Sequence, residues 1–289
     1  MRADLQNIKT EKHDIGLLQL LLSDDEDDED QAVTACVPSD ENCPPQLTLE
    51  ERISSSLQLS PTERISLEKK TRGQATNPCW FEAKQGRVSA SSAKACSTGG
   101  QPASEIKKIL TCGKPSRRPK SKHITYGIEH EDNAARLYVA QMKGEGVEVT
   151  LQEVGFFVHP EHGELGASPD RMLIKNGKKM VLEIKCLSAS RHLTPSEAIA
   201  ENEKKPSFPV QRLPDGTIKM KKKHQYYHQV QMQMACCQVN QCDFVMFTNL
   251  SAPVLMVSVD FCEDFWNPIK EKLLEFHKNY IVPGLVHLR

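Results

Sequence analysis

The sequence predicts an α/β domain with a central mixed β-sheet flanked by helices, preceded by a disordered acidic tail. Two observations predict this arrangement. After residue 72, segments with helical periodicity alternate with apolar, strand-like segments, in the order helix, strands, helix, strands, helix. Before it, the chain is rich in Ser, Pro and Glu and has too few apolar residues to build a core. We therefore expect a tail at 1–72 and a globular domain at 73–289.

Charge separates the two parts. Residues 1–70 hold 7 Lys and Arg against 16 Asp and Glu, a balance of −9, and the rest of the chain holds 30 against 22, a balance of +8. The acids are continuous from Asp24 to Asp30, and such a block repels itself and stays solvated. The apolar run Leu17–Leu22 beside it could dock on a protein partner. The basic domain favours a polyanionic partner, although a merely solvated surface fits the charge equally well.

Composition excludes several classes of protein. No apolar run approaches the roughly 18 residues that a membrane span needs. The run Ile15–Leu22 is eight residues long, includes Gln19 and lies between acidic residues, unlike a signal peptide. We therefore expect an intracellular protein that is not secreted and has no membrane partner. The ten cysteines include no Cys-x-x-Cys pair, which predicts reduced thiols rather than disulfides or a structural zinc site.

Local patterns place the elements of the domain. The dipeptide Asn176-Gly177 predicts a tight hairpin turn, and Gly127 to about Met142 has a clear helical period. The expected helices are 91–96, 127–142, 195–204, 222–239 and 263–281. The expected strands are a pair in 147–158, a strand at 165–174 interrupted by Pro169, and strands at 180–186, 244–248 and 254–261. Residues 97–122 are expected to be a loop or broken helices, and 213–217 a turn.

The most informative segment is the apolar strand Val181–Cys186. Alternation along a strand places Glu183 and Lys185 on the same face, opposite Leu182 and Ile184. An edge strand with a solvated face would account for this pair. Asp170 favours a functional reading, because the hairpin can bring it and Glu183 together at one end of the sheet. Two carboxylates from two strands suit a hard cation such as Mg²⁺, and a neighbouring lysine suits a water or a phosphate oxygen.

Four ordered motifs resemble one family. Ser168-Pro169-Asp170 and Leu182–Cys186 together resemble the PD-(D/E)XK motif of restriction-endonuclease-like nucleases. Residues 80–91 (WFEAKQGRVSAS) resemble a W-x-x-x-R-x-G-R-[IV]-[ST]-A-S segment, 127–131 (GIEHE) a G-x-x-x-E helix start, and 226–231 (YYHQVQ) a Y-x-x-Q-x-Q helix. These are motifs of the YqaJ-like viral recombinase family, relatives of lambda exonuclease, and the resemblance covers about residues 76–285.

The resemblance implies a metal site and a catalytic lysine. It implies that Asp170 and Glu183 are metal-binding carboxylates, with the carbonyl of Ile184 as a further ligand and Glu131 completing the site. It implies that Lys185 positions the attacking water and stabilises developing charge. For Glu131, the residues alone equally favour an acid in the first helical turn, placed there for the helix dipole.

Further positions of the motifs are implied to contact DNA. Gln229 and Tyr226 match residues that orient groups near the scissile phosphate, and a polar stripe on a half-buried helix is a serious alternative for Gln231 and Gln233. Lys84 and Ser91 match positions that contact the terminal phosphate of DNA. The family has an arginine where this chain has Lys84, which implies a looser grip on phosphate, and we expect Arg87 to compensate.

The expected activity is hydrolysis of DNA phosphodiester bonds with Mg²⁺ as cofactor and Mn²⁺ as a substitute. By resemblance it is a 5′-to-3′ exonuclease acting on DNA ends in recombination or repair, and a homo-oligomer is compatible because related nucleases can form rings. The alternative is a catalytically silent, nuclease-derived DNA-binding or adaptor protein. The basic cluster Lys114–Lys122 fits a nuclear import signal, a DNA contact or a solvated loop, and with it we expect the nucleus rather than the cytoplasm.

Overall fold

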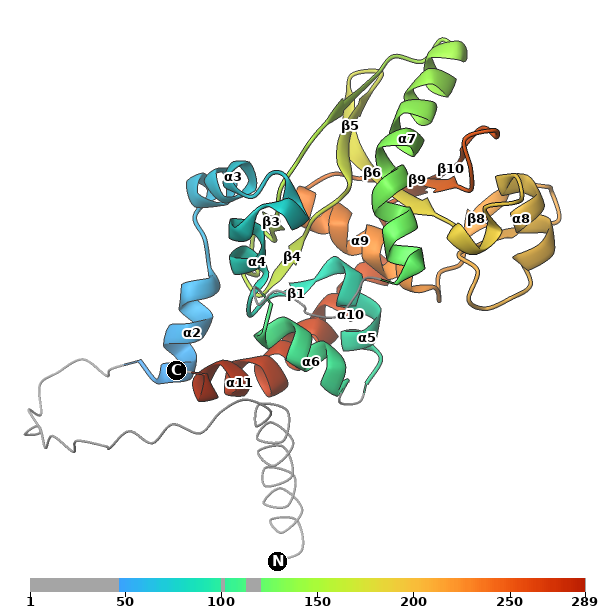
Figure 1. The fold of residues 1–289 in the computed structure, drawn as a ribbon. Helices are drawn as coiled ribbons and strands as arrows, with labels where there is room; N and C mark the ends of the chain where they lie inside the picture. The colour runs from blue at the N-terminus through green and yellow to red at the C-terminus, as the bar shows by residue number, and fades with distance from the viewer. Residues whose placement is uncertain (1–46, 100–101, 113–120, 289) are drawn as a thin grey trace, which may run out of the picture.

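The computed structural model describes residues 47–99, 102–112 and 121–288, and its centre is a five-stranded mixed sheet (Figure 1). The strands lie in the order β10-β9-β6-β5-β2, and β6 pairs in parallel with β9 while the other pairs are antiparallel. Their bounds are β2 Val149–Gln152, β5 Arg171–Lys175, β6 Lys178–Cys186, β9 Gln241–Phe247 and β10 Leu255–Asp260. Because helices cover both faces, the expected fold class is confirmed.

Two helices cover the two faces of this sheet. On one face, Tyr138 and Met142 of α7 (Lys122–Gly144) pack with Leu182 in one apolar cluster. On the other face, Val230 of α9 (Gln225–Cys237) packs with Phe244 in a second cluster. Alternate residues of β6 therefore point into different apolar layers, as the period of a strand requires. Strand β6 is the middle strand of five, and this excludes a solvated edge.

The expected hairpin between β5 and β6 is confirmed. Lys175 pairs with Lys178 across a two-residue loop, and Asn176 and Gly177 have φ of 49° and 76°. Positive φ at both loop positions belongs to the turn type that matches the natural twist of paired strands. The register of this hairpin pairs Arg171 with Leu182, which fixes Asp170 beside the carboxyl-terminal half of β6.

A smaller sheet has the order β1-β4-β3, with β1 Val88–Ser89, β3 Phe157–Val158 and β4 Leu165–Ala167. Two expectations from sequence are wrong here. The segment 147–158 is not a strand pair, because β2 joins the large sheet and β3 the small one. The segment 165–174 is likewise two strands in two sheets. The chain changes sheets around Pro169, which lacks the N–H that a continuous ladder would need.

Most of the remaining helices lie below the sheets in Figure 1, and one of them, α8 (Pro195–Asn202), lies at the right. They are α4 Pro78–Lys84, α5 Ala93–Ser97, α6 Ala103–Leu110, α8 Pro195–Asn202, α10 Glu263–Phe276 and α11 Val282–His287. The expected terminal helix 263–281 includes a π-helical turn at His277–Ile281, which leads into α11. The turn expected at 213–217 joins a short hairpin of β7 (Val210–Arg212) and β8 (Ile218–Met220). Among the described residues, no helix is long and apolar enough to cross a membrane.

The expectation of disorder over 1–72 is wrong for residues 47–72. This stretch forms α2 (Leu49–Leu57) and α3 (Pro61–Lys70), each with a capping box at its start. Ile53 is buried, and Glu68 accepts a hydrogen bond from the backbone N–H of Gly155. The helices have little apolar surface of their own, but caps and contacts with the domain stabilise them. The acidic run 24–30, the apolar run 17–22 and most of the basic cluster 114–122 lie outside the described residues.

Candidate active site

The site is built around Glu183, a carboxylate with 1% relative exposure in the middle of the central strand β6. Its Oε1 accepts hydrogen bonds from Lys185 Nζ and Gln229 Nε2, both at 2.5 Å. Its Oε2 accepts one from Gln233 Nε2 at 2.6 Å. A charge this deeply buried is tolerated only when it is paired and hydrogen-bonded, and here three donors meet that need.

Lys185 lies between this carboxylate and an aromatic ring. Its Nζ is 4.9 Å from the ring centroid of Tyr226, in the first turn of α9. Burial alone would lower the pKa of Lys185, but the negative charges of Glu183 and Asp170 outweigh it and raise the pKa above its ordinary value. Lys185 is therefore a stable ammonium at neutral pH, able to donate hydrogen bonds and to offset negative charge but not to act as a base.

Asp170 lies next to the same strand, as the hairpin predicts. Its Oδ2 accepts a hydrogen bond of 2.6 Å from the backbone N–H of Ile184. Burial, and then the charge of Glu183, raise the pKa of Asp170 well above its usual range, against the lowering effect of Lys185. Two carboxylates raise each other's cost of ionisation only when they are close, so these two form one electrostatic unit.

Glu131 approaches this unit from α7. It is the tenth residue of the helix, so the alternative of a first-turn acid placed for the helix dipole is wrong. Its Oε1 accepts a hydrogen bond of 3.1 Å from Arg171, which also contacts Asp132 and the backbone oxygen of Asp170. Burial is the main cause that raises the pKa of Glu131; Arg171 opposes it, and the charge of Glu183 adds to it.

Two site residues escape the sequence argument. Gln233 fits a polar stripe by sequence, yet it is fully buried and donates to Glu183, while its own Oε1 has no hydrogen-bond partner among the described residues. Its position four residues after Gln229, on the same helix face, is the signal that could have found it. Arg171 follows Asp170 directly but carries no motif. Gln231, in contrast, binds the backbone of Asp260 and Cys262 and is structural.

Arg87 cannot serve the phosphate role expected of it. The residue has 8% relative exposure, and its guanidinium donates to the backbone oxygens of Gly163, Ala83 and Leu57 at 2.8, 2.9 and 3.0 Å. These contacts join α2, α4 and the segment before β4. The expectation that Arg87 compensates for the missing arginine of the family is therefore wrong, because its donors already bind the protein's own backbone.

Lys84 is the last residue of α4, and Ser91 lies in the short 3₁₀ turn before α5. Lys84 Nζ is 3.8 Å from the ring centroid of Trp80. Burial lowers the pKa of Lys84 to about 8, with a smaller lowering effect from the charge of Lys108. Ser91 is exposed, and its hydroxyl shares a hydrogen bond of 3.2 Å with that of Ser89. The structure gives both residues access to a ligand, and within the described residues it records no contact between them.

No group of three or more His, Cys, Asp or Glu side chains in the described parts is already arranged as a metal site. Three carboxylates are nevertheless at hand as oxygen donors. Asp170, Glu183 and Glu131 lie close enough for their charges to affect the pKa values of Asp170 and Glu131.

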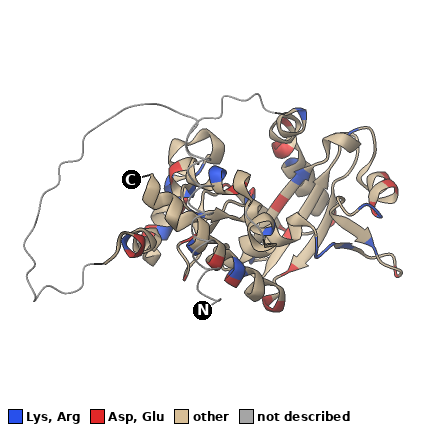
Figure 2. Cartoon of the chain, turned by 90° about the horizontal axis from the view of Figure 1, so that it is seen from below, with Lys and Arg blue, Asp and Glu red and all other residues tan. Residues whose placement is uncertain are grey.

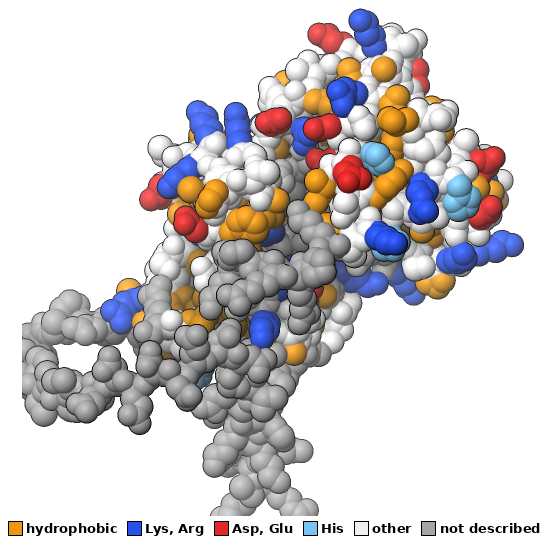
Figure 3. All heavy atoms as spheres, viewed as in Figure 1, with side chains coloured by type: hydrophobic (Ala, Val, Ile, Leu, Met, Phe, Trp, Pro, Cys, Tyr) orange, Lys and Arg blue, Asp and Glu red, His pale blue; other side chains and the backbone are white. Residues whose placement is uncertain are grey.

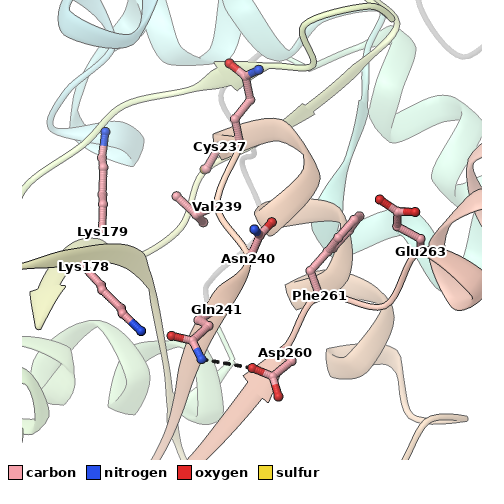
Figure 4. Close-up of a pocket in the computed structure, with 10 residues that line it drawn as sticks. Lys178, Lys179, Cys237, Val239, Asn240, Gln241, Asp260, Phe261 and Glu263 are labelled. Atoms are coloured by element: carbon pink, nitrogen blue, oxygen red, sulfur yellow. Dashed lines mark hydrogen bonds between the residues drawn. The ribbon is translucent and has the colours of Figure 1, made fainter.

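A separate hollow of about 840 Å³ lies at the starting end of β6, lined by Lys178, Lys179 and Asp260 among others. Figure 4 shows these side chains pointing in different directions around an open space, with the one drawn hydrogen bond between Gln241 and Asp260. This hollow lies at the opposite end of the sheet from the carboxylates.

Comparison with known proteins identifies the family of this chain. Residues 79–240 match the YqaJ-like viral recombinase domain. The crystal structure of an alkaline exonuclease, LHK-Exo, from Laribacter hongkongensis is similar, with a TM-score of 0.52 and 21% identity over 72% of this chain and 94% of that one. The same enzyme in complex with dAMP gives 0.53 and 23% over the same shares.

A phage-related exonuclease from Haemophilus somnus is a more distant likeness, with a TM-score of 0.43 and 16% identity over 70% of this chain and 96% of that one. No curated protein sequence matches this chain significantly. The family match spans more than half of the chain, and the two LHK-Exo structures share its fold. The chain therefore belongs to the YqaJ-like viral recombinase domain family, as the four motifs indicate.

Proposed function

We propose that this protein is a metal-dependent deoxyribonuclease that hydrolyses phosphodiester bonds progressively from the 5′ end of DNA, in recombination or repair. One observation carries the proposal: a buried carboxylate, Glu183, is held by a protonated lysine and two amides, with Asp170 bound to the next residue of the same strand. This concentration of charge is costly for folding, and such costs are typical of catalytic sites.

The donor set fits a hard divalent cation. Asp170, Glu183 and the carbonyl of Ile184 would hold Mg²⁺ or Mn²⁺, with Glu131 as a further oxygen donor. Burial, together with the nearby charge of Glu183, raises the pKa values of Asp170 and Glu131, and a bound cation would lower the cost of ionising both carboxyls. When bound, such a cation polarises a phosphate oxygen and makes hydroxide available near neutral pH.

The chain's own residues supply positioning and charge. Lys185 stays protonated and can donate to a phosphate oxygen as negative charge develops there. Gln229 and Gln233 fix both oxygens of Glu183, so this carboxylate cannot rotate away from the strand end. The Tyr226 ring beneath Lys185 limits where the ammonium can go. The protein's own side chains supply each of these contacts, which is the condition for electrostatic preorganisation.

The complete set of Glu131, Asp170, Glu183 and Lys185 favours an enzyme over the silent adaptor, because an adaptor has no need to retain such a costly cluster. Two parts of the proposal, the 5′-to-3′ direction of cleavage and the preference for DNA, rest on the family resemblance and on Lys84 at the expected end-phosphate position.

A nuclease assay tests this function directly. Linear duplex DNA is labelled at the 5′ or at the 3′ end and incubated with the protein in Mg²⁺ or in a chelator. We expect immediate release of the 5′ label as mononucleotide and late release of the 3′ label, in Mg²⁺ only. Full cleavage in a chelator would contradict the metal assignment. Salt-dependent DNA binding without cleavage in either Mg²⁺ or Mn²⁺ would establish the adaptor instead.

A further inference from the structure

A second charged surface adjoins the site, formed by residues 203–224. We call it the basic arm; it runs from the end of α8 through the β7–β8 hairpin to the start of α9. The arm contains seven Lys and Arg and two acids, Glu203 and Asp215, in a chain whose net charge is −1. In Figure 3 basic side chains gather at the lower right edge, and Figure 2 shows Lys and Arg along the same right-hand side of the cartoon.

The charges of the arm are concentrated along one hollow of about 860 Å³. Its lining includes Lys204, Arg212, Lys219, Lys221, Lys222 and Lys223. Of these, only Lys221 has its side chain partly buried, and its Nζ donates to the backbone oxygen of Lys205. Within the described residues, the five others form no ion pair. Like charges left close together and unpaired destabilise a protein, so this surface is matched to an external anion.

The arm is a fixed part of the fold rather than a loose loop. Phe208, Val210 and Met220 are buried in the same apolar cluster as the inner face of α9. The backbone N–H of Lys221 donates to the oxygen of Pro209, and the His224 ring bonds the backbone oxygen of Ser207. The lysines are thus held on a rigid base, and only their flexible side chains project.

The arm also leads directly into the candidate active site. His224 is the N-cap of α9, and its Nδ1 accepts the backbone N–H of Tyr226. The ring of Tyr226 lies beneath Lys185. Tyr226 follows Lys223 by three positions, and a chain of that length spans at most about 11 Å. Phosphates of duplex DNA recur about every 3.4 Å of helix axis along each strand. A strand that reaches Lys185 therefore has further phosphates within reach of the arm.

We propose that the basic arm binds the phosphate backbone of the duplex DNA on which the active site acts. The proposal rests on the proposed function for the identity of the anion. Six positive charges and one acid, Glu203, line the hollow, and five of the six positive charges are lysines, which act as point charges rather than as bidentate forks. The contact is therefore independent of base sequence, and it sets affinity and register while the carboxylate site performs the chemistry.

The test compares two triple variants with the same loss of charge. The arm variant is Lys219→Gln/Lys222→Gln/Lys223→Gln. The control variant is Lys143→Gln/Lys178→Gln/Lys272→Gln, which removes exposed lysines from α7, β6 and α10. Binding to a fluorescent 30-base-pair duplex is measured by anisotropy in a chelator, over a series of salt concentrations, so that no cleavage occurs.

We expect the arm variant to bind at least about 10-fold more weakly at 0.1 M salt. Its log–log salt slope should be shallower by about 2–3, since each phosphate contact to a duplex contributes about 0.9. The control variant should bind like the native protein, and the triple Lys→Arg variant of the arm should keep the native slope because charge is retained. Equal weakening by arm and control variants, or a native slope in the arm variant, would overturn the proposal.

Two outcomes separate this proposal from the proposed function. If the native protein binds DNA through the arm but never cleaves it, the nuclease assignment fails and the arm stands. If the native protein cleaves DNA while the arm variant keeps native affinity and slope, the arm fails alone. Thermal unfolding of all variants identifies any that has lost its fold.

Discussion

Two buried carboxylates lie on opposite faces of the central sheet, each paired with a lysine, and their surroundings differ. On the α7 face, Asp243 is fully buried and accepts hydrogen bonds from Tyr138 at 2.6 Å, Lys175 at 2.8 Å and Ser258 at 2.8 Å. On the α9 face, Glu183 is equally well bonded. The two networks use similar chemistry, so burial and hydrogen bonding alone do not distinguish a functional site.

Charge balance distinguishes them. The charge of Asp243 is matched by that of Lys175, and burial, followed by the hydrogen bond to Asp243, raises the pKa of Tyr138. Glu183 shares one lysine with Asp170, and Glu131 adds a third negative charge. Burial, with a further contribution from the charge of Glu183, raises the pKa values of Asp170 and Glu131. The neutral pair of Asp243 and Lys175 has a structural role in the sheet. The excess of negative charge around Glu183 is suited to binding a cation.

The largest expected effect follows from removing the balanced carboxylate. Asp243→Asn should lower the free energy of unfolding by about 3–5 kcal/mol, because Lys175 would lose its buried partner. Asp170→Asn should cost less than about 1 kcal/mol, or stabilise the protein, because it relieves repulsion while its side-chain oxygen can still accept the Ile184 N–H. Urea unfolding in a chelator measures both, and similar losses in the two variants would remove the distinction between the networks.

The next effect concerns catalysis on the α9 face. Lys185→Ala should lower single-turnover cleavage by roughly 100-fold, the scale of losing one preorganised electrostatic contact, because no other ammonium in the described parts of the chain bonds Glu183. Mg²⁺ binding should be largely kept, since the lysine supplies no oxygen ligand. Lys175→Met on the other face should lose stability but cleave normally where it is folded. Native cleavage by Lys185→Ala would show that this cluster is structural too.

A smaller effect is expected from the cation itself. At Mg²⁺ ten times above its dissociation constant, the native protein should gain about 1.4 kcal/mol of stability, as ligand linkage requires for one site. Asp170→Asn should lose this gain, and a lysine variant on the other face, Lys175→Met, should keep it. Thermal unfolding with and without Mg²⁺ gives the comparison without any need for turnover. An equal gain in Asp170→Asn would mean that the cation binds elsewhere.

Much of the site follows from sequence because it depends on short-range geometry. The turn at Asn176-Gly177 fixes the hairpin register, and strand alternation places Glu183 and Lys185 on one face. Helix spacing can place Gln233 on the same face as Gln229, but neither its bond to Glu183 nor the role of Arg171 could be found this way. Their roles depend on which side of α9 meets β6 and on how closely α7 approaches β5, and tertiary packing decides both.

The errors have the same origin. Arg87 resembles a phosphate ligand in its motif, but its three backbone acceptors come from segments as distant as Leu57 and Gly163. Composition predicts disorder for the stretch that forms α2 and α3, because composition counts only the apolar surface that a segment brings itself. These helices borrow partners from the domain, including the N–H of Gly155. Local patterns contain no information about such distant partners.

The smallest expected effect is a pH dependence at Lys84, which lies outside both networks. Burial lowers its pKa from the ordinary 10.5 to about 8, so the folded protein loses this ammonium as pH rises from 7 to 9. The charged form is the disfavoured one, so this group makes folding stability increase with pH between about 8 and 10.5. A 5′-phosphate is already almost fully ionised at pH 7, with its second pKa near 6, so the lysine alone titrates in this range.

The preference for a 5′-phosphorylated over a 5′-hydroxyl duplex should therefore fall about fivefold from pH 7 to 9, which corresponds to roughly 1 kcal/mol for one charge contact. Lys84→Arg should keep its preference at both pH values because a guanidinium stays charged, and Lys84→Met should show little at either. Competition binding with the two duplexes in a chelator measures this, and a native preference that is flat across the range would exclude Lys84 from the end-phosphate contact.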